Sequence, residues 1–306
     1  MPMNTRDLHA FVAVVDSGSI VQAAATLHLT QPGVTRRVQS LETMLGLQLL
    51  DRQSKPLRPT AAGREVYLKG RQLLHAEEEL MALTRPDAEP SGELRLGMPP
   101  FVAERALTTP IDCLRESYPL LRLRILAGWS PSLAQRMEQG DLDVVVVVFP
   151  ENMPPPAGML AHELGRQAIK VVASRSMNLR TRVSLKDLAA VPWVLSQDGC
   201  GMRATLRRAL ESQGLPFNVG VEASGADLQL SLVARGAGIG LVPSDLLADS
   251  HCRNQLKVLS VSDFKVSVVA WLVHRPLPPR LEAPVALLLA QLRKAMAGRR
   301  SRDPSA

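Results

Sequence analysis

The stretch LHLTQPGVTRRVQSLE, residues 27–42, restricts the fold more than any other part of the chain. Its second half and the residues just after it carry an apolar row at the spacing of one helix face, namely Val34, Val38, Leu41 and Leu45. Pro32 and Gly33 stand before this row, although Pro-Gly normally marks a turn. Thr30 as an N-cap places Pro32 in the first helical turn, where a missing N–H costs no hydrogen bond. We therefore predict a helix that starts near Thr30 and ends before Gly46.

Two shorter helices precede this one in the sequence. Thr5 is expected to cap the first, whose apolar face holds Leu8, Phe11, Val12 and Val15 and which Gly18 ends. Ser19 starts the second, which is rich in alanine and leads through a brief turn to Thr30. Two helices joined by a tight turn, the second polar on its outer face, are typical of a helix-turn-helix.

The outer face of the third helix carries side chains suited to reading DNA. Thr30 starts this helix, and the residues that point away from the apolar row are Gln31, Pro32, Thr35, Arg36 and Gln39. Arg and Gln bind base edges bidentately, and Thr reaches bases or phosphates, while Arg37 on the flank suits a phosphate. Gly33 would let the backbone approach DNA closely. The alternative is an ordinary solvent-facing helix.

The next stretch, LLDRQSKPLRPT, favours the DNA-binding interpretation. It is too short and too rich in proline for a helix, and it carries Arg52, Lys55, Pro56 and Arg58. These residues fit a wing, a two-stranded ribbon that lies along the DNA backbone or minor groove. From residue 35 to residue 71 there are eight Lys and Arg against three Asp and Glu. The whole chain has a net charge of +7, which suits an acidic partner.

Residues 60–84 predict one long helix with a dimer seam. Two rows repeat every seven residues, which is typical of a coiled-coil-like pair, and they include Val66, Leu73, Leu74, Leu80 and Met81. Lys69 and Gly70 interrupt these rows. The alternative is a single helix that lies on its own domain. A dimer would place two recognition helices on a two-fold-symmetric site in double-stranded DNA.

The first 65 residues resemble the LysR-type transcriptional regulators in the order and spacing of their motifs. The resemblance rests on segments such as Gly18-Ser19, Thr30-Gln31-Pro32, Val34-Thr35-Arg36 and Leu45-Gly46. It implies that Gln31, Pro32, Thr35 and Arg36 read bases and that Lys55 and Pro56 form the wing tip. It also implies a homodimer or a dimer of dimers, a small-molecule effector, contact with RNA polymerase and no cofactor.

From residue 92 onward, strand-like and helix-like runs alternate, which favours α/β units around mainly parallel sheets. GELRLGMPP, GDLDVVVVV and LVARGAGIGLVP are similar to the effector domain of that family. The implied fold class is an α+β two-domain chain: a winged helix-turn-helix, a linker helix and a two-lobed α/β effector domain that resembles a type 2 periplasmic binding protein. We expect the DNA-binding domain at 1–59, the linker helix at 60–84, a hinge at 85–91, the effector domain at 92–300 and a flexible tail at 301–306. Lobe I would take 92–163 and 268–300, and lobe II 164–267.

Ligands of such sheets bind beyond the carboxyl ends of the strands, and that rule selects the effector-binding candidates. On lobe I they are Pro99, Pro100, Phe101, Gly128, Trp129, Ser130 and Phe149. On lobe II they are Ser196, Cys200, Gly201, Met202, Arg203 and Ser224. Prolines donate no hydrogen bond, so the first loop offers a carboxylate no donor, although Ser130 and Ser132 remain and helix N-termini favour anions.

Three other functions stay open. SQDGCGMR around Cys200 resembles the reactive-cysteine loop of peroxide-sensing relatives, although no second cysteine follows in the next helix. GWSPS around Ser130 nearly matches the nucleophile elbow of hydrolases but lacks its last glycine. A protein that only binds a ligand is the third.

The remaining features exclude several classes of protein. The three cysteines lie far apart, which excludes a disulfide framework and argues against a metal site. GAGIG at 236–240 follows a helix, the wrong context for a dinucleotide loop. Asp141 and Asp143 suggest a solvated turn. No apolar run reaches the ~20 residues of a membrane span, so we expect a cytoplasmic regulator without membrane contact and without enzymatic activity.

Overall fold

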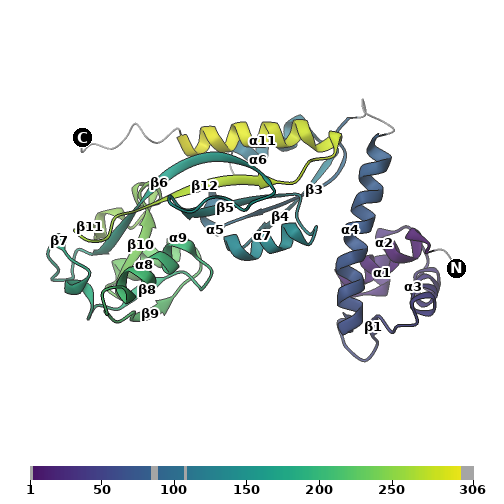
Figure 1. Ribbon diagram of the computed structural model, residues 1–306, viewed down its shortest axis with the longest axis horizontal. Coiled ribbons are helices and arrows are strands. Elements are labelled where there is room, and N and C mark those ends of the chain that lie inside the picture. The colour runs from purple at the N-terminus through teal and green to yellow at the C-terminus, as the bar shows by residue number, and fades with distance from the viewer. Residues whose placement is uncertain (1–2, 84–88, 107–108, 298–306) are drawn as a thin grey trace. The chain divides into compact units, whose positions relative to one another are not determined.

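The computed structural model describes residues 3–83, 89–106 and 109–297, and the chain divides near residue 87 into two compact units. Figure 1 shows a helical N-terminal unit and a C-terminal unit built on a sheet. The expected hinge at 85–91 falls largely outside the described residues, and the expected tail at 301–306 lies wholly outside them. In the described part of the chain, no helix is long and apolar enough to cross a membrane.

Three short helices open the N-terminal unit. They are α1 (Thr5–Ser17), α2 (Ile20–Thr26) and α3 (Gln31–Leu45). The expected cap of α1 is wrong by one residue, because the Asn4 side chain accepts from the Arg6 N–H and Thr5 is already helical. Ser19 caps α2 as predicted, and Gly18 after α1 has a φ of 63°, which favours glycine.

Helix α3 begins and ends as predicted. The Thr30 hydroxyl accepts from the Gly33 N–H at 3.2 Å, and Gly46 after the last turn has a φ of 65°. Val34, Val38 and Leu41 are buried in one core with residues of α1 and α2. The apolar row therefore fixes which face of α3 remains outside.

A small ribbon follows α3, as expected for a wing. Strand β1 (Leu50–Asp51) pairs antiparallel with β2 (Arg58–Pro59), with Leu50 opposite Pro59. Leu50 is buried, and the loop between the strands is largely exposed. The proline-rich stretch thus forms a two-stranded ribbon and no helix.

Helix α4 (Ala61–Leu83) lies against α1 over its N-terminal half. Two glycines make this close approach possible. A Cβ on Gly63 would lie 2.0 Å from the Leu49 carbonyl oxygen, and one on Gly70 would lie 2.6 Å from Leu8 Cδ1. Gly70 therefore breaks the apolar rows because α1 occupies the space of its side chain.

The expected seam residues on α4 separate into two groups. Leu74 is buried in the core of the N-terminal unit, so it is not available to a seam, whereas Val66 packs against this core and is half-buried. Leu73, Leu80 and Met81 are 41%, 65% and 63% exposed. The alternative of a helix lying on its own domain holds for the first half of α4, and the second half keeps an exposed apolar stripe.

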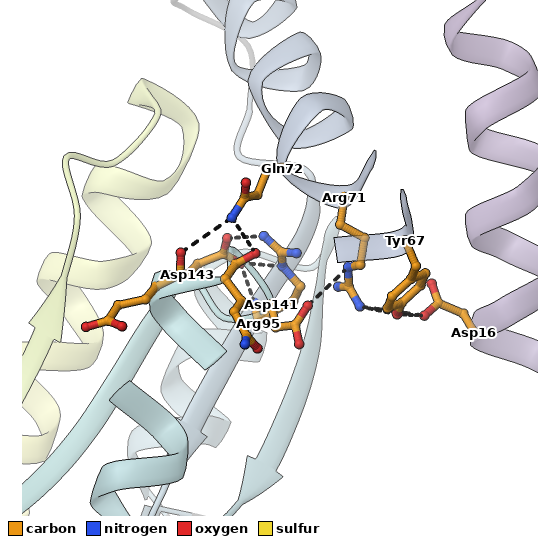
Figure 2. A network of polar contacts seen from close by, with 9 residues as sticks. Asp16, Tyr67, Arg71, Gln72, Arg95, Asp141 and Asp143 are labelled. Carbon is orange, nitrogen blue, oxygen red and sulfur yellow. Dashed lines mark hydrogen bonds and ion pairs between the residues drawn. The ribbon is translucent and has the colours of Figure 1, made fainter. Parts of the chain in front are cut away.

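A polar cluster fixes α4 against the end of α1 (Figure 2). The Tyr67 hydroxyl donates to Asp16, and Arg71 Nη1 donates to the Tyr67 hydroxyl at 2.8 Å. Burial, followed by the Asp16 carboxylate, raises the pKa of Tyr67 to about 12, so Tyr67 remains a donor. Arg71 also offsets the negative charge that Asp16 places near the C-terminus of α1.

The C-terminal unit contains one mixed sheet with the strand order β4-β3-β5-β12-β6-β10-β8-β9. The strands at one end are β3 (Gly92–Met98), β4 (Leu121–Ala127) and β5 (Val144–Pro150). Those at the other end are β8 (Trp193–Leu195), β9 (Val219–Glu222) and β10 (Ile239–Pro243). The two strands between them are β6 (Leu160–Ser174) and β12 (Val266–His274). Strand β11 (Leu256–Val261) also pairs with β6, and β7 (Arg182–Val183) pairs with β11.

Helices cover this sheet, as Figure 1 shows for α11 along β6 and β12. On lobe I the helices are α5 (Pro100–Ala106), α6 (Thr109–Ser117), α7 (Ser130–Glu138) and α11 (Pro279–Ala297). On lobe II they are α8 (Gly201–Glu211), α9 (Ala226–Ala234), α10 (Ser244–Asp249) and the short turns η1 (Lys186–Leu188) and η2 (Arg253–Gln255). The two groups of three end strands are parallel, and β12 and β6 run antiparallel between them, which agrees with the predicted mainly parallel α/β pattern.

The expected solvated turn at Asp143 is wrong. Asp143 is 8% exposed, and its carboxylate accepts from the Arg95 backbone N–H at 2.7 Å and from Arg95 Nη2 at 2.6 Å (Figure 2). Arg95 is itself buried in β3. The Asp143 carboxylate therefore links β3 to the start of β5, because both the backbone and the guanidinium of Arg95 donate to it.

Candidate functional site

The exposed face of α3 carries the predicted DNA-reading residues on one side. Thr30, Gln31, Pro32, Arg36 and Gln39 are exposed, and Thr35 is half-buried beside them. Arg37, on the flank, donates from Nη1 to the Arg6 carbonyl at 3.4 Å. The buried row on the opposite face holds this surface in place, and the Ser40 hydroxyl ties α3 to Asp7 of α1 at 2.9 Å.

Gly33 has a local role in the cap of α3. A Cβ at this position would lie 3.1 Å from the Thr30 hydroxyl that accepts the Gly33 N–H. A side chain would therefore crowd the N-cap. This contact favours a small residue at the cap, whereas the expected close approach to DNA stays a prediction.

The wing presents its basic residues to solvent. Lys55, Pro56 and Arg58 are exposed in the loop and at the start of β2. Arg52 is paired with Glu42 of α3, with Nη2 3.0 Å from Oε2, and its side chain is still 54% exposed. The ribbon can thus touch a polyanion through three cations, one of them tethered to α3.

Glu42 is the residue of this surface that the sequence reasoning missed. Its Oε1 accepts from the backbone N–H of Leu49 at 2.8 Å and of Leu50 at 3.3 Å, while Oε2 holds Arg52. One carboxylate therefore fixes the wing to the end of α3. The signal in the sequence was an acidic residue in a basic stretch, next to the buried Leu41.

A narrow cavity lies in the C-terminal unit where both groups of strands end. Its lobe I wall is formed by Pro100, Phe101 and Trp129. Its lobe II wall is formed by Ser196, Met202, Gly225, Ala226, Gln229, Leu241, Val242, Pro243 and Leu246. With its mouth it measures about 330 Å³, and the centre of a water molecule can occupy only about 20 Å³ of it. Five predicted effector-binding residues thus line it: Pro100, Phe101, Trp129, Ser196 and Met202.

Sequence reasoning missed the part of this wall built by α9, β10 and α10. Gln229 is buried, and its Nε2 donates to the Val194 carbonyl at 2.8 Å. Gly225 and Ala226 begin α9 one and two residues after the predicted Ser224, which is exposed and outside the lining. The rule that ligands bind beyond the carboxyl ends of parallel strands identified the end of β8 but not the end of β10. The glycines of GAGIG, residues 236–240, make the start of β10 hard to recognise in the sequence.

Several predicted effector-binding residues serve the fold and do not line the cavity. The buried Ser130 hydroxyl accepts from the Val148 N–H at 2.9 Å and donates to the Val148 carbonyl at 3.2 Å. The carbonyl of Pro99 accepts from the first turn of α5, and the Gly128 N–H donates to Met98. Phe149 packs against the core beside β5, and Gly201 lies against the Val148 carbonyl.

Arg203 is committed to its own lobe. Its Nη1 is 2.8 Å from Glu222 Oε1 and 2.9 Å from the Ser196 carbonyl, and its Nε is 3.1 Å from Asp198 Oδ1. The Phe217 ring covers its guanidinium. Arg203 therefore positions Ser196 and does not line the cavity.

Cys200 is buried at the N-terminus of α8 and is a free thiol. Burial raises the pKa of the Cys200 thiol despite nearby hydrogen bonds. The thiolate is the reactive form, so this environment disfavours redox chemistry. Cys113 and Cys252 are also free.

Two protein families match the chain. Residues 5–64 match the family described as "Bacterial regulatory helix-turn-helix protein, lysR family", and residues 87–297 match "LysR substrate binding domain". The HTH-type transcriptional regulator CzcR of Bacillus anthracis is 30% identical over 79% of this chain and 80% of that protein. The nitrogen assimilation regulatory protein nac of Klebsiella aerogenes is 28% identical over 79% of this chain and 78% of that protein.

Solved structures show the same fold. A full-length OxyR variant from Pseudomonas aeruginosa gives a TM-score of 0.72 at 20% identity and covers 96% of this chain and 95% of its own. Full-length CbnR in complex with its target DNA gives 0.63 at 23% identity and covers 96% and 100%. Together with the family matches over both units, the winged helix-turn-helix and the sheet with its cavity lead to one conclusion: the chain belongs to the LysR family of transcriptional regulators.

Proposed function

We propose that this regulator reads a DNA sequence with α3 and grips the DNA backbone with its wing. The observation that carries the proposal is the exposed row Gln31, Arg36 and Gln39 with the half-buried Thr35 beside it, held outward by the buried Val34, Val38 and Leu41. Side chains of this kind donate and accept hydrogen bonds at base edges in the major groove. Lys55 and Arg58 add contacts to phosphates, which strengthen binding to any sequence.

The chain acts as a dimer in this proposal. Leu73, Leu80 and Met81 form an exposed apolar stripe on the second half of α4, which a second copy would cover. Two copies present two α3 helices to a two-fold-symmetric operator. A dimer of such dimers would bind two adjacent sites.

A small effector would bind in the cavity between the two lobes. Strands β6 and β12 are shared by both lobes, so a ligand that favours one lobe arrangement changes the shape of the whole C-terminal unit. The resulting shift in the spacing of the two α3 helices would alter promoter activity. Ser130 offers no nucleophile in support of an enzymatic alternative, since its hydroxyl is bound to Val148.

Two single variants test the DNA part of this proposal by fluorescence anisotropy. Arg36→Ala should reduce discrimination between the native upstream DNA and altered sites by ~1–3 kcal/mol, because a base contact is lost. Lys55→Ala should weaken binding to all DNA similarly and reduce the slope of affinity against salt by about one unit, because a phosphate contact is lost. Unchanged discrimination by Arg36→Ala would remove α3 from base reading.

A further inference from the structure

The wall of the cavity holds no ionisable side chain among the described residues that line it. The polar side chains on the wall are the Ser196 hydroxyl and the Gln229 amide, and both are neutral. Gln229 is held in one orientation by its 2.8 Å hydrogen bond to the Val194 carbonyl. Trp129, Phe101 and Met202 provide a largely apolar surface beside them.

The cation closest in sequence to this wall is already neutralised. Arg203 lies next to Met202 and contacts two carboxylates, Asp198 at 3.1 Å and Glu222 at 2.8 Å. Asp198 is also shared with Arg207 at 3.2 Å. A ligand carboxylate would have to compete with these acidic groups for Arg203.

The backbone near the cavity offers only dipoles. Pro100 has no N–H to donate at the start of α5. Ala226 begins α9, whose N-cap Gly225 provides no side-chain acceptor, so the N–H groups there can donate to an oxygen of the ligand. A buried carboxylate without a cation would lose its hydration with little return.

We propose, on the basis of the effector site described under Proposed function, that the effector is an uncharged molecule with a flat apolar ring and one hydrogen-bonding end. The ring lies against Trp129 and Phe101, and the polar end meets Ser196 and Gln229. The ligand is small, because the cavity measures about 330 Å³ with its mouth. It moves the flexible Met202 side chain aside on entry, since only about 20 Å³ is open to the centre of a water molecule.

Matched pairs of aromatic amides and carboxylates test this charge preference on the full chain. The probes are benzamide with benzoate, indole-3-acetamide with indole-3-acetate, and cinnamamide with cinnamate. Thermal shift and calorimetry should show at least one amide that binds more than about tenfold tighter than its carboxylate. A carboxylate that binds as tightly as its amide would overturn the proposal, and so would a panel in which no amide binds.

A charge placed in the wall gives an independent test. Met202→Lys replaces one long unbranched side chain with another that carries a cation. The ratio of carboxylate affinity to amide affinity should therefore rise by about tenfold or more in this variant. Met202→Gln, of similar length and neutral, is the control and should keep the preference for amides. If Met202→Lys binds carboxylates no better than the parent chain does, the cavity is not where the ring compounds bind, and the proposal fails.

Failure of this inference is distinguishable from failure of the proposed function. Gel retardation with upstream DNA, run on the same protein sample, reports DNA binding without any ligand. Retarded DNA together with a carboxylate preference would refute only the uncharged effector. DNA that is not retarded would refute the proposed regulator, whatever the ligand panel shows.

Discussion

The Thr30 hydroxyl and the left-handed conformation of Gly46 fix the two ends of α3, the helix proposed to read DNA. Thr30, Val34, Val38 and Gly46 took the predicted places in α3, because caps and helix periodicity are local properties. Ser130 could not be assigned from sequence, since its hydroxyl bonds to Val148, a strand away. Polar residues whose partners are distant in the chain are the ones that local patterns fail to place.

The environment of Cys200 predicts how fast its thiol reacts. Its raised pKa keeps the thiol protonated at neutral pH, and burial blocks access. Alkylation of Cys200 by iodoacetamide at neutral pH should be at least about tenfold slower in the folded chain than in urea. Peptide mapping by mass spectrometry measures this, with the half-buried Cys113 as the internal control.

Rapid labelling of Cys200 in the folded protein would support the alternative that this regulator senses redox state through Cys200. A second outcome with the same meaning is a change in DNA affinity on peroxide treatment that Cys200→Ser abolishes. The structure disfavours both outcomes, because a reactive cysteine requires an accessible thiolate.

At the scale of elements, periodicity predicted helices well and strands less well. The short apolar run at residues 170–174 is the end of β6, which begins at Leu160. Its first half contains His162, Glu163, Arg166 and Gln167, so it lacks the apolar run of a buried strand. Pairing with β12 holds this half in the sheet, and such a partner far along the chain cannot be read from local sequence.

The close contact of α4 with α1 predicts how a side chain at position 70 changes stability. Gly70→Ala places a methyl group 2.6 Å from Leu8 Cδ1, so overpacking should cost ~1–3 kcal/mol, partly offset by up to ~1 kcal/mol of helix propensity. Urea unfolding should show a net loss of about 1 kcal/mol in the stability of the unit that holds α4. Lys69→Ala, at the exposed neighbouring position, is the control and should stay within ~0.5 kcal/mol of the parent. A stabilised Gly70→Ala chain would mean that α4 does not pack closely on α1.

At the scale of the whole molecule, the proposed function depends on two copies of the chain. The sequence predicted a seam of five residues, yet Leu74 is buried in its own unit and Val66 packs against that core. The seven-residue rows serve two different surfaces. The first half of α4 packs on α1, and the second half leaves Leu80 and Met81 exposed. A repeat in a sequence shows that a face is apolar but does not show which surface covers it.

The exposed stripe leads to a prediction about assembly. Leu80→Glu with Met81→Glu should weaken dimerisation by ~100-fold or more, because two large apolar side chains per copy lose their burial. Analytical ultracentrifugation measures the shift from dimer to monomer. Leu228→Glu, at a residue 53% exposed on α9, is the matched control and should leave the dimer intact. A double variant that sediments like the parent chain would place the dimer contact elsewhere.

The proposed function as a whole depends on sequence-specific DNA binding by the intact protein. The most direct measurement is a titration of the full chain against its own upstream DNA and against a shuffled duplex of equal length and composition, at one fixed salt concentration. We predict that the upstream DNA binds ~10³-fold tighter or more, because α3 reads bases while the wing contacts only the backbone. Equal affinity for the two duplexes would contradict the account.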